Sequence, residues 1–380
     1  MSATRGRILA VDDDAAMLRT VERILSPSHD VRGAASGEEA LRLFREEPSD
    51  VAIIDIRMPG MDGYAVTRAI KEIRPATEVI LVTGSVSDLD EKLIRSVQER
   101  AGFFITKPFS RSVLTSLVDR CLEIQELERE RDDLIRRLTD DLERARRFQL
   151  ALLPRGLPRA FGPLQVAAGH LSCERVGGDL YDVAALPDGR LLLSVADVAG
   201  HGVAAALVTG MIKTVLDAGV REEPDLAATA AAVLDTLAPL SQQRMITLLL
   251  VLVNPRTKSI DYLNAGHPPL IVWGGKDGPA LLSATTPLLS FGLGLSKDPV
   301  RTHPFRPGDR LALYSDGLYE VRDPAGKEFG RERFTETVVA AGPERLEQAA
   351  KRLLDQAVRH AGGRPPEDDL TLLLAEFAKG

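Results

Sequence analysis

Carboxylates stand at the ends of apolar runs in the first part of this 380-residue sequence. Three follow one run, a fourth follows another, and a lysine follows a third: Asp12, Asp13, Asp14, Asp55 and Lys107. If these runs are parallel strands, the side chains meet at the carboxyl edge of the sheet, where open α/β sheets place ligands. Grouped carboxylates can hold a hard cation such as Mg²⁺ through oxygen. Asp55 is then free to attack phosphorus as a nucleophile, and Lys107 can neutralise the product.

A second group of acidic residues lies in the later part of the chain. It comprises four stretches that contain Asp179 with Asp182, Asp197, Asp316, and Asp368 with Asp369. One aspartate beside a strand is commonly a turn or cap residue, but four such stretches in one domain would repel one another unless metal bound them. Oxygen-only ligands suit Mg²⁺ or Mn²⁺ rather than zinc. Two such ions can share a bridging carboxylate and a water, whose lowered pKa lets it attack phosphorus in line.

The stretch SVADVAGHG, residues 194–202, holds the central candidate of this group. Asp197 ends an apolar run and is the expected chemical residue, while the glycines around His201 permit a tight turn before a helix. We expect His201 and His267 to be structural; a general acid at His201 and a site role for His267 are the alternatives. Ser315 precedes an acidic residue in an apolar run, which favours a buried strand serine over a nucleophile.

Two different patterns of elements must position these residues. Over residues 5–120 short apolar runs alternate with helical-period segments, which predicts βαβ units around a parallel sheet. These runs are 8–11, 51–54, 79–82 and 103–105. Over residues 155–380 strand-like runs dominate and helical patterns are few, which predicts antiparallel sheets covered by helices. The later runs are 190–197, 246–253, 259–264, 268–273, 310–315 and 369–376, with helical patterns at about 202–218, 225–240 and 344–360.

Between Pro108 and Pro154 the chain has no glycine or proline, and this stretch predicts one long helix. Apolar residues along it fit one heptad register: Leu117, Ile124, Leu127, Leu134, Leu138, Ala145, Phe148 and Leu152. Arg120, Arg131 and Asp141 interrupt the seam, and charges of both signs occupy the other faces. The pattern predicts a two-stranded coiled coil, and hence a homodimer. A single helix packed on its own domains is the alternative.

Bulk composition excludes several classes of protein. No apolar run approaches the ~20 residues that a membrane span needs, and the N-terminus lacks a secretory apolar region. The two cysteines, Cys121 and Cys173, are too few for a disulfide framework and lack metal-ligand spacing. The formal net charge of −7 argues against a nucleic-acid surface. A cytoplasmic protein is expected.

The first part of the chain resembles the response-regulator receiver domain over about residues 5–120. The motifs ILAVDDD, VAIIDIRMPGMDGYAV, ILVTG and FFITKPF occur in the order and spacing of that family. The resemblance implies a CheY-like doubly wound parallel (βα)5 sheet, with Asp55 as the phosphoacceptor and a histidine kinase as the phosphodonor. It also implies a Mg²⁺ site of Asp12, Asp13, Asp55 and the Arg57 carbonyl, and a switch of Thr83, Phe104 and Lys107.

The triple aspartate leaves the register of that site open by one residue, and Asp13 is the expected direct ligand. A receiver-shaped domain that is never phosphorylated is the alternative, although no required side chain is missing.

The later part resembles the SpoIIE/RsbU-type branch of the metal-dependent PPM serine/threonine phosphatases over about residues 148–378. After FQLALLP come VGGDLYD, VADVAGHG, NAGHPPLIV, LALYSDGLYE, FGRERF and DDLTLLL, in the order of that branch. The resemblance implies an α-β-β-α sandwich with two Mn²⁺ or Mg²⁺ ions at one edge. The implied catalytic ligands are Asp179, Asp197, the Val198 carbonyl, Asp316 and Asp368, with Asp369 as the alternative to Asp368. Asp182 is expected to support the ligands rather than to be one.

Together the patterns predict an α/β multidomain chain with a receiver domain at 1–120, a helical coiled-coil linker at 121–150 and a phosphatase domain at 151–380. The predicted function is a two-component response regulator in which phosphorylation of Asp55 regulates hydrolysis of a phosphoserine or phosphothreonine protein. The resemblance implies a STAS-type anti-sigma-factor antagonist as the substrate. The alternative is a pseudophosphatase adaptor whose partner binding is controlled by receiver phosphorylation. A DNA-binding regulator would need a basic helix-turn-helix after the receiver, and the strand-rich remainder does not suggest one.

Overall fold

The computed structural model describes residues 5–84, 102–173, 175–200, 202–219, 224–237, 245–274, 278–290 and 292–379. The chain divides into two compact units, Met1–Leu138 and Thr139–Gly380, and each is described by itself. One helix, α5 (Arg111–Leu152), has residues in both. The helical segment expected between the runs 79–82 and 103–105, and His201, lie outside the described residues.

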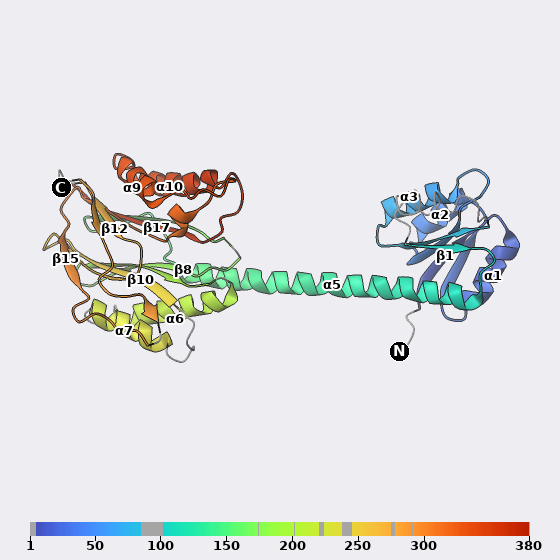
Figure 1. Cartoon of the computed structure of the whole chain (residues 1–380), viewed down its shortest axis with the longest axis horizontal. Helices are drawn as coiled ribbons and strands as arrows, with labels where there is room; N and C mark the ends of the chain where they lie inside the picture. Colours follow the sequence, from blue (N-terminus) through green and yellow to red (C-terminus); the bar gives the residue numbers. More distant parts are fainter. Residues whose placement is uncertain are drawn as a thin grey trace. The chain divides into compact units, whose positions relative to one another are not determined.

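The first unit contains a five-stranded parallel sheet with the strand order β2-β1-β3-β4-β5. Strands and helices alternate along the chain (Figure 1): β1 (Arg7–Val11), α1 (Ala15–Leu25), β2 (Asp30–Ala34), α2 (Gly37–Glu46), β3 (Val51–Asp55), α3 (Gly63–Ile73), β4 (Glu78–Thr83) and β5 (Phe103–Thr106). This order and pairing confirm the predicted doubly wound sheet.

Helices cover both faces of this sheet, as a parallel sheet requires. Successive strand residues point to opposite faces, and β1 shows it. Leu9 and Val11 pack in one core cluster with residues of α2 and α3. Ile8 and Ala10 pack in another cluster with residues of α1 and the first part of α5.

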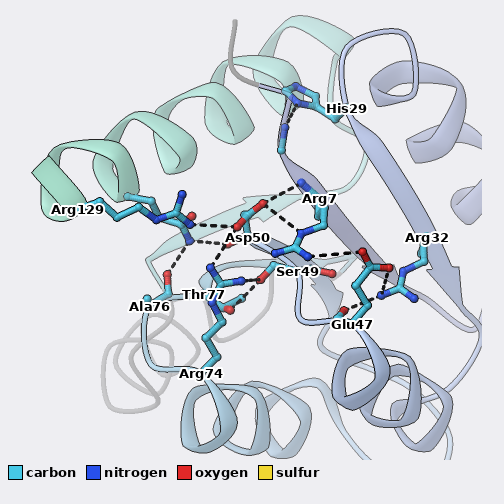
Figure 2. Close-up of polar contacts among 12 residues, drawn as sticks. Arg7, His29, Arg32, Glu47, Ser49, Asp50, Arg74, Ala76, Thr77 and Arg129 are labelled. Atoms are coloured by element: carbon cyan, nitrogen blue, oxygen red, sulfur yellow. Dashed lines mark hydrogen bonds and ion pairs between the residues drawn. The ribbon is translucent and has the colours of Figure 1, made fainter.

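A polar network closes the amino-terminal edge of the sheet (Figure 2). At its centre lies Asp50, directly before β3. One Asp50 carboxylate oxygen accepts a hydrogen bond from the Arg7 backbone N–H at 3.0 Å, and the other accepts from the guanidinium groups of Arg74 and Arg129 at 3.2 Å each. Three arginines therefore share one carboxylate.

Helix α5 is attached to this edge by two side chains. Besides Arg129, the buried Gln125 donates from Nε2 to the backbone carbonyls of Asp50 and Ala76, at 2.6 Å each. The Asp50 carbonyl also accepts from the Glu78 N–H at 3.0 Å, so it takes part in the pairing of β3 with β4. Gln125 thus connects α5 to the segments that lead into both β3 and β4.

We expect Asp50→Asn to destabilise the first unit by roughly 2 kcal/mol, because hydrogen bonds to a charged group are lost. Burial alone would raise the pKa of Asp50, but the Arg7 N–H and the charges of Arg74 and Arg7 outweigh it, so the pKa is lowered. The carboxylate therefore stabilises the fold above its ordinary pKa, and this contribution disappears as pH falls through the lowered value. The difference in unfolding free energy between Asp50→Asn and the wild type should therefore become smaller below about pH 4.

Hydrogen–deuterium exchange of the β1 and β3 amides in the intact chain measures this effect. Glu46→Gln is the control, because the pair of Glu46 with Arg42 lies on the surface of α2 with both side chains more than half exposed and should contribute little. Wild-type exchange rates in Asp50→Asn at neutral pH would contradict the prediction.

The second unit contains two six-stranded sheets, whose described pairs between named strands are all antiparallel. Their orders are β15-β11-β10-β9-β8, with β14 beside β10, and β13-β12-β16-β17-β7-β6. The strands are β6 (Arg159–Phe161), β7 (Leu164–Leu171), β8 (Asp179–Ala185), β9 (Leu191–Val198), β10 (Met245–Asn254), β11 (Ser259–Ala265), β12 (Leu270–Trp273), β13 (Ala280–Leu282), β14 (Leu289–Ser290), β15 (Arg301–Pro304), β16 (Arg310–Tyr314) and β17 (Leu370–Phe377).

Helices cover the outer face of each sheet in this unit (Figure 1). They are α6 (Val203–Gly219), α7 (Leu226–Leu237), α8 (Gly317–Glu320), α9 (Arg331–Ala340) and α10 (Leu346–His360). Residues of α6 and α7 join the large core cluster that both sheets share. Residues of α8, α9 and α10 form a second cluster on the sheet that contains β17. The predicted α-β-β-α sandwich is confirmed.

Helix α5 confirms the predicted long helix, with 42 residues. Four of its heptad residues, Leu127, Leu134, Leu138 and Phe148, are each more than half exposed. An apolar seam on a solvated helix is typical of coiled-coil segments. The seam is present in the single chain, and the dimer remains a prediction.

Candidate active site

Strand pairing in the second unit brings two of the predicted aspartates opposite each other. In the antiparallel pair of β8 and β9, Asp179 is the direct partner of Asp197, so their side chains lie on the same face of the sheet. Thr247 of β10 is the next residue in this row. Like charges directly opposite each other destabilise a strand pair. The row therefore needs a compensating group.

Residues of the opposing sheet reach this row. Asp369 is buried, and its two carboxylate oxygens accept from the backbone N–H groups of Cys173 at 2.9 Å and Asp179 at 3.2 Å. Thr371 Oγ1 donates to Asp179 Oδ2 at 2.5 Å. Ser315 is buried, as expected, but lies directly after β16 rather than in it. Its Oγ donates to the Asp369 carbonyl at 3.1 Å and accepts from the Thr371 N–H at 3.0 Å. These bonds join the two sheets at the acidic edge.

Three glycines make this close approach possible. A Cβ at Gly177 would lie 1.7 Å from Asp369 Oδ2, one at Gly178 would lie 2.5 Å from the Val198 carbonyl oxygen, and one at Gly317 would lie 2.3 Å from the Asp369 carbonyl oxygen. These distances are too short for any other residue type. The glycines of VGGDLYD and SDGLYE therefore let the backbone come close to the acidic groups.

Burial and mutual repulsion raise the pKa values in this acidic group. The pKa of Asp197 rises to about 7, first because of burial and then because of the surrounding carboxylates, Asp316 foremost. The pKa of Asp179 lies well above its usual range because of burial and the charges of Asp197 and Asp369. Burial also raises the pKa of Asp316. Among the described residues, no basic side chain offsets the charge of these three carboxylates.

The donor atoms suit a hard divalent cation. The group offers only oxygen, which Mg²⁺ and Mn²⁺ prefer, and its repulsion is of the kind that a bound cation offsets. Within the ranges that the structure describes, no group of three or more acidic, histidine or cysteine side chains is placed so that it could hold a metal ion. The charge and the donor types of this group thus fit Mg²⁺ or Mn²⁺.

The other predicted ligands lie around the same edge. Asp316 follows β16 at the start of α8. Asp368 and Asp369 take different positions, because Asp369 is buried whereas Asp368 is exposed and accepts from the Asp369 N–H at 2.8 Å. The Val198 N–H donates to the Gly178 carbonyl at 3.2 Å. The edge is therefore built from four chain segments that are distant in sequence.

Two of the residues considered from the sequence have other partners. Asp182 lies three positions after Asp179, hence on the other face of β8, and pairs with Lys213 of α6 at 2.9 Å. It does not belong to the acidic row. His267 is buried, with Nδ1 2.7 Å from Thr247 Oγ1, and burial lowers its pKa to about 3. A neutral, hydrogen-bonded imidazole agrees with the structural role that we expected.

Gln149 of α5 is a residue that sequence reasoning did not single out. Its buried side-chain amide accepts from the Gly177 N–H at 3.0 Å and donates to the Gly177 carbonyl at 2.7 Å and to Thr209 Oγ1 of α6 at 3.3 Å. Gly177 precedes Asp179 by two residues. The end of α5 therefore holds the loop that carries an acidic residue of the site. The signal in the sequence was a lone polar residue within FQLALLP.

In the first unit, Lys107 joins two carboxylates at the carboxyl edge of the parallel sheet. Its Nζ lies 2.6 Å from Asp12 Oδ2 and 2.8 Å from Asp55 Oδ1. Burial raises the pKa of Asp55 in spite of the lysine. Burial alone would lower the pKa of Lys107, but its hydrogen bonds with Asp12 and Asp55 raise it. The charged lysine thus partly offsets the repulsion of the two carboxylates.

The three consecutive aspartates have separate environments. Asp14 is the N-cap of α1, and its Oδ1 accepts from the Ala16 N–H at 2.8 Å. Asp12 is buried and accepts from the Asp14 N–H at 3.0 Å in addition to Lys107. Asp13 is exposed. Asp14 therefore has a capping role that Asp12 and Asp13 do not share.

The remaining receiver residues surround Asp55. Its Oδ2 accepts from the Arg57 N–H at 3.0 Å. A Cβ at Gly63 would lie 2.2 Å from the Asp55 carbonyl oxygen, so only glycine fits there. Thr83 is buried at the end of the neighbouring strand β4, and Phe104 on β5 is partly buried against the core. These positions agree with the order of the sequence motifs.

The first unit is a parallel-sheet domain with an acidic, lysine-bridged edge, and the second is an α-β-β-α sandwich with an acidic edge. Together they define a class of protein, a receiver joined to a PP2C-type phosphatase fold. The sequence profile of the family described as Stage II sporulation protein E (SpoIIE) matches residues 187–378, just over half of the chain. That of the response regulator receiver domain matches residues 8–119. The chain belongs to the SpoIIE family and carries a response-regulator receiver domain at its N-terminal end.

Known proteins resemble parts of the chain. The SiaA-PP2C domain of Pseudomonas aeruginosa is similar with a TM-score of 0.58 and 24% identity, covering 64% of this chain and 98% of that one, which supports the fold. The transcriptional regulatory protein GlrR of Escherichia coli (strain K12) is 34% identical over 126 residues, 32% of this chain and 28% of that protein. The DNA-binding transcriptional regulator NtrC of Klebsiella pneumoniae is 36% identical over 140 residues, 36% of this chain and 29% of that protein.

The chain thus spans less than a third of the length of these two regulators. None of the described helices is both long and apolar enough to cross a membrane.

Proposed function

We propose that this chain is a two-component response regulator whose output is a metal-dependent protein serine/threonine phosphatase. The observation that carries the proposal is the row of opposed carboxylates Asp179 and Asp197, to which the opposing sheet adds Asp369. No basic side chain among the described residues offsets the charge of Asp179 and Asp197. A domain that tolerates this repulsion at one edge is suited to bind cations there.

In this proposal the phosphatase site takes two Mn²⁺ or Mg²⁺ ions. They would be held by the side chains of Asp179, Asp197, Asp316 and Asp368 and by the Val198 carbonyl, with Asp369 as the alternative to Asp368. Bound metal ions would lower the pKa of a water and stabilise charge on a phosphoryl group. The chain's own part is positioning. Asp369 holds the backbone N–H of Asp179, and Thr371 holds one oxygen of the Asp179 carboxylate.

The receiver would accept a phosphoryl group on Asp55 from a histidine kinase. A Mg²⁺ ion would be held by Asp12, Asp13, Asp55 and the Arg57 carbonyl. Lys107 already contacts both Asp12 and Asp55, which places its charge beside the phosphoryl group. Thr83 and Phe104 would change position in response. We place this domain at 1–120, the linker at 121–150 and the phosphatase domain at 151–380.

Helix α5 would connect the switch to the site. Its exposed seam supports a parallel two-stranded coiled coil and hence a homodimer. At its end, Gln149 contacts the Gly177 peptide, so that a shift of the helix reaches the loop of Asp179. The substrate would be a phosphoserine or phosphothreonine protein of the STAS-type anti-sigma-factor antagonist class, which the family resemblance supports.

The test is hydrolysis of p-nitrophenyl phosphate by the full chain with Mn²⁺, with a chelator, and with beryllofluoride as a mimic of phosphorylated Asp55. We expect turnover that requires Mn²⁺ and changes at least threefold with beryllofluoride, and we expect Asp55→Asn to remove that change. Turnover that ignores beryllofluoride would overturn the coupling alone. Absence of turnover with every metal, on phosphoproteins as well, would overturn the enzyme and favour the pseudophosphatase adaptor.

A further inference from the structure

A hydrogen-bonded chain of four side chains leads from the acidic row to the end of β7. Thr371 Oγ1 donates to Asp179 Oδ2 at 2.5 Å. His170 Nδ1 lies 2.9 Å from the same Thr371 oxygen, and His170 Nε2 lies 3.1 Å from Ser172 Oγ. Thr371 and His170 are direct partners in the antiparallel pair of β17 and β7, so the strand register holds the contact in place.

The hydrogen atoms available on these side chains determine which group donates and which accepts in each hydrogen bond. A hydroxyl has one hydrogen, and the ionised Asp179 that would bind a cation can only accept, so Thr371 uses its hydrogen on this carboxylate. The Thr371 oxygen must then accept from His170, so Nδ1 carries a hydrogen. Burial lowers the pKa of His170, so the ring is neutral and its Nε2 accepts from Ser172. In this arrangement Ser172 donates to His170, His170 donates to Thr371, and Thr371 donates to Asp179.

We propose that His170 is a positioning residue for the metal site, because it holds the Thr371 hydroxyl in the orientation that aims its hydrogen at Asp179. The inference rests on the proposed function, since it concerns how Asp179 is prepared for a cation. Thr371 fixes one oxygen of this carboxylate, Oδ2, and so helps to set the orientation of the whole group. Without His170, the hydroxyl can rotate away and Asp179 loses its fixed orientation. Residues that orient metal ligands in this way typically change metal affinity by about 10–100-fold.

Substitutions of His170 distinguish two roles, one in which the side chain only fills space and one in which its Nδ1 donates a hydrogen bond. Asparagine places an amide N–H at the position of Nδ1, whereas leucine keeps bulk without a donor. Likewise Thr371→Ser keeps the hydroxyl, and Thr371→Val keeps the shape without it. The informative comparison is therefore within each pair of variants, at nearly constant volume.

The experiment is Mn²⁺ binding to the full chain by isothermal titration calorimetry, with turnover of p-nitrophenyl phosphate recorded in parallel. We expect His170→Leu and Thr371→Val to weaken Mn²⁺ binding at least tenfold, while His170→Asn and Thr371→Ser stay within about threefold of wild type. His303→Leu is the matched control, because His303 lies on β15 in the sheet that lacks β7 and β17, and it should bind Mn²⁺ like wild type.

Equal affinities in His170→Leu, Thr371→Val and wild type would overturn the inference and leave the proposed function intact. If His170→Leu does not fold, Mn²⁺ binding by Thr371→Ser, Thr371→Val and His170→Asn tests the inference instead. Weak Mn²⁺ binding by His170→Asn would overturn it, and so would wild-type Mn²⁺ binding by Thr371→Val. A wild-type chain that binds no Mn²⁺ overturns the proposed function itself, and the inference with it.

Discussion

Asp197→Asn is expected to abolish Mn²⁺-dependent hydrolysis and, at the same time, to stabilise the metal-free protein. The first effect follows because Asp197 lies at the centre of the proposed ligand set, and the loss should exceed the roughly 100-fold typical of residues that only support ligands. The second follows because Asp197 faces Asp179 directly across the strand pair. Removal of one of two opposed charges relieves their repulsion.

The stabilisation should depend on pH in a defined direction. Since the pKa of Asp197 is raised to about 7, the folded chain takes up a proton more readily than the unfolded chain. Its stability therefore falls as pH rises from about 4 to 7. Asparagine removes this dependence. The gain should be roughly 1–2 kcal/mol at pH 5 and on the order of 4 kcal/mol at pH 8, since the pKa is raised from 3.8 to about 7 and one pKa unit corresponds to about 1.4 kcal/mol.

Chemical denaturation in the presence of a chelator measures the gain, and Trp273 in the second unit gives a fluorescence signal for it. Asp188→Asn is the matched control, because Asp188 lies in the exposed hairpin between β8 and β9 and makes its ion pair with Arg190 there. It should alter neither turnover nor the pH dependence. Wild-type turnover in Asp197→Asn would remove the basis of the metal-site proposal.

Gln149→Leu is expected to lower Mn²⁺-dependent turnover about 10–100-fold and to remove its response to beryllofluoride. Leucine keeps the size of the side chain but loses all three hydrogen bonds of the amide. The N–H and carbonyl of the buried Gly177 peptide then lack partners, which costs about 1–3 kcal/mol for each group. The loop can avoid this cost by moving, and Asp179 would move with it.

Turnover and calorimetric Mn²⁺ binding of the full-length variant test this prediction. Gln348→Leu on the exposed surface of α10 makes the same chemical change on another helix and should leave both quantities unchanged. If Gln149→Leu keeps wild-type turnover and a wild-type response, then α5 does not act through the Gly177 peptide, and another contact must connect the units.

Much of the fold could be predicted because its central strands are continuously apolar. The strand β10, with the sequence MITLLLVLVN, is buried on both faces, so its run stands out without any alternation. Most of the strands that were missed are polar or short, although β7, LQVAAGHL, is neither. The exposed edge strand β2, DVRGA, carries charges and a glycine, and β8, DLYDVAA, begins and continues with aspartates. Charged residues and glycine interrupt the apolar pattern in these two strands, so neither one forms a continuous apolar run.

The acidic residues of the site could also be found in the sequence, but their separate roles could not. Asp179 and Asp182 look alike in VGGDLYD, and only the strand period places one in the acidic row and the other against Lys213. Asp368 and Asp369 are adjacent and identical in the sequence, and only the structure shows that Asp369 is buried and Asp368 is exposed. The contact of Thr371 with Asp179 joins residues of two sheets, and no local pattern encodes the register between sheets.

The exposed stretch of α5 has a practical consequence. Every side chain of residues 126–138 is exposed, and this stretch contains Arg131, Arg136 and Arg137, after which trypsin cleaves. In a chain that is not paired through the proposed coiled coil, this helical segment has no packed neighbours and opens locally at little cost in free energy, so a protease can reach it before either compact unit unfolds. Brief digestion would divide the chain into two pieces, one that keeps Gln125 and its carbonyl partners and one that keeps Gln149 and the acidic edge. Limited proteolysis can therefore define fragments for separate study, without an assumed domain boundary.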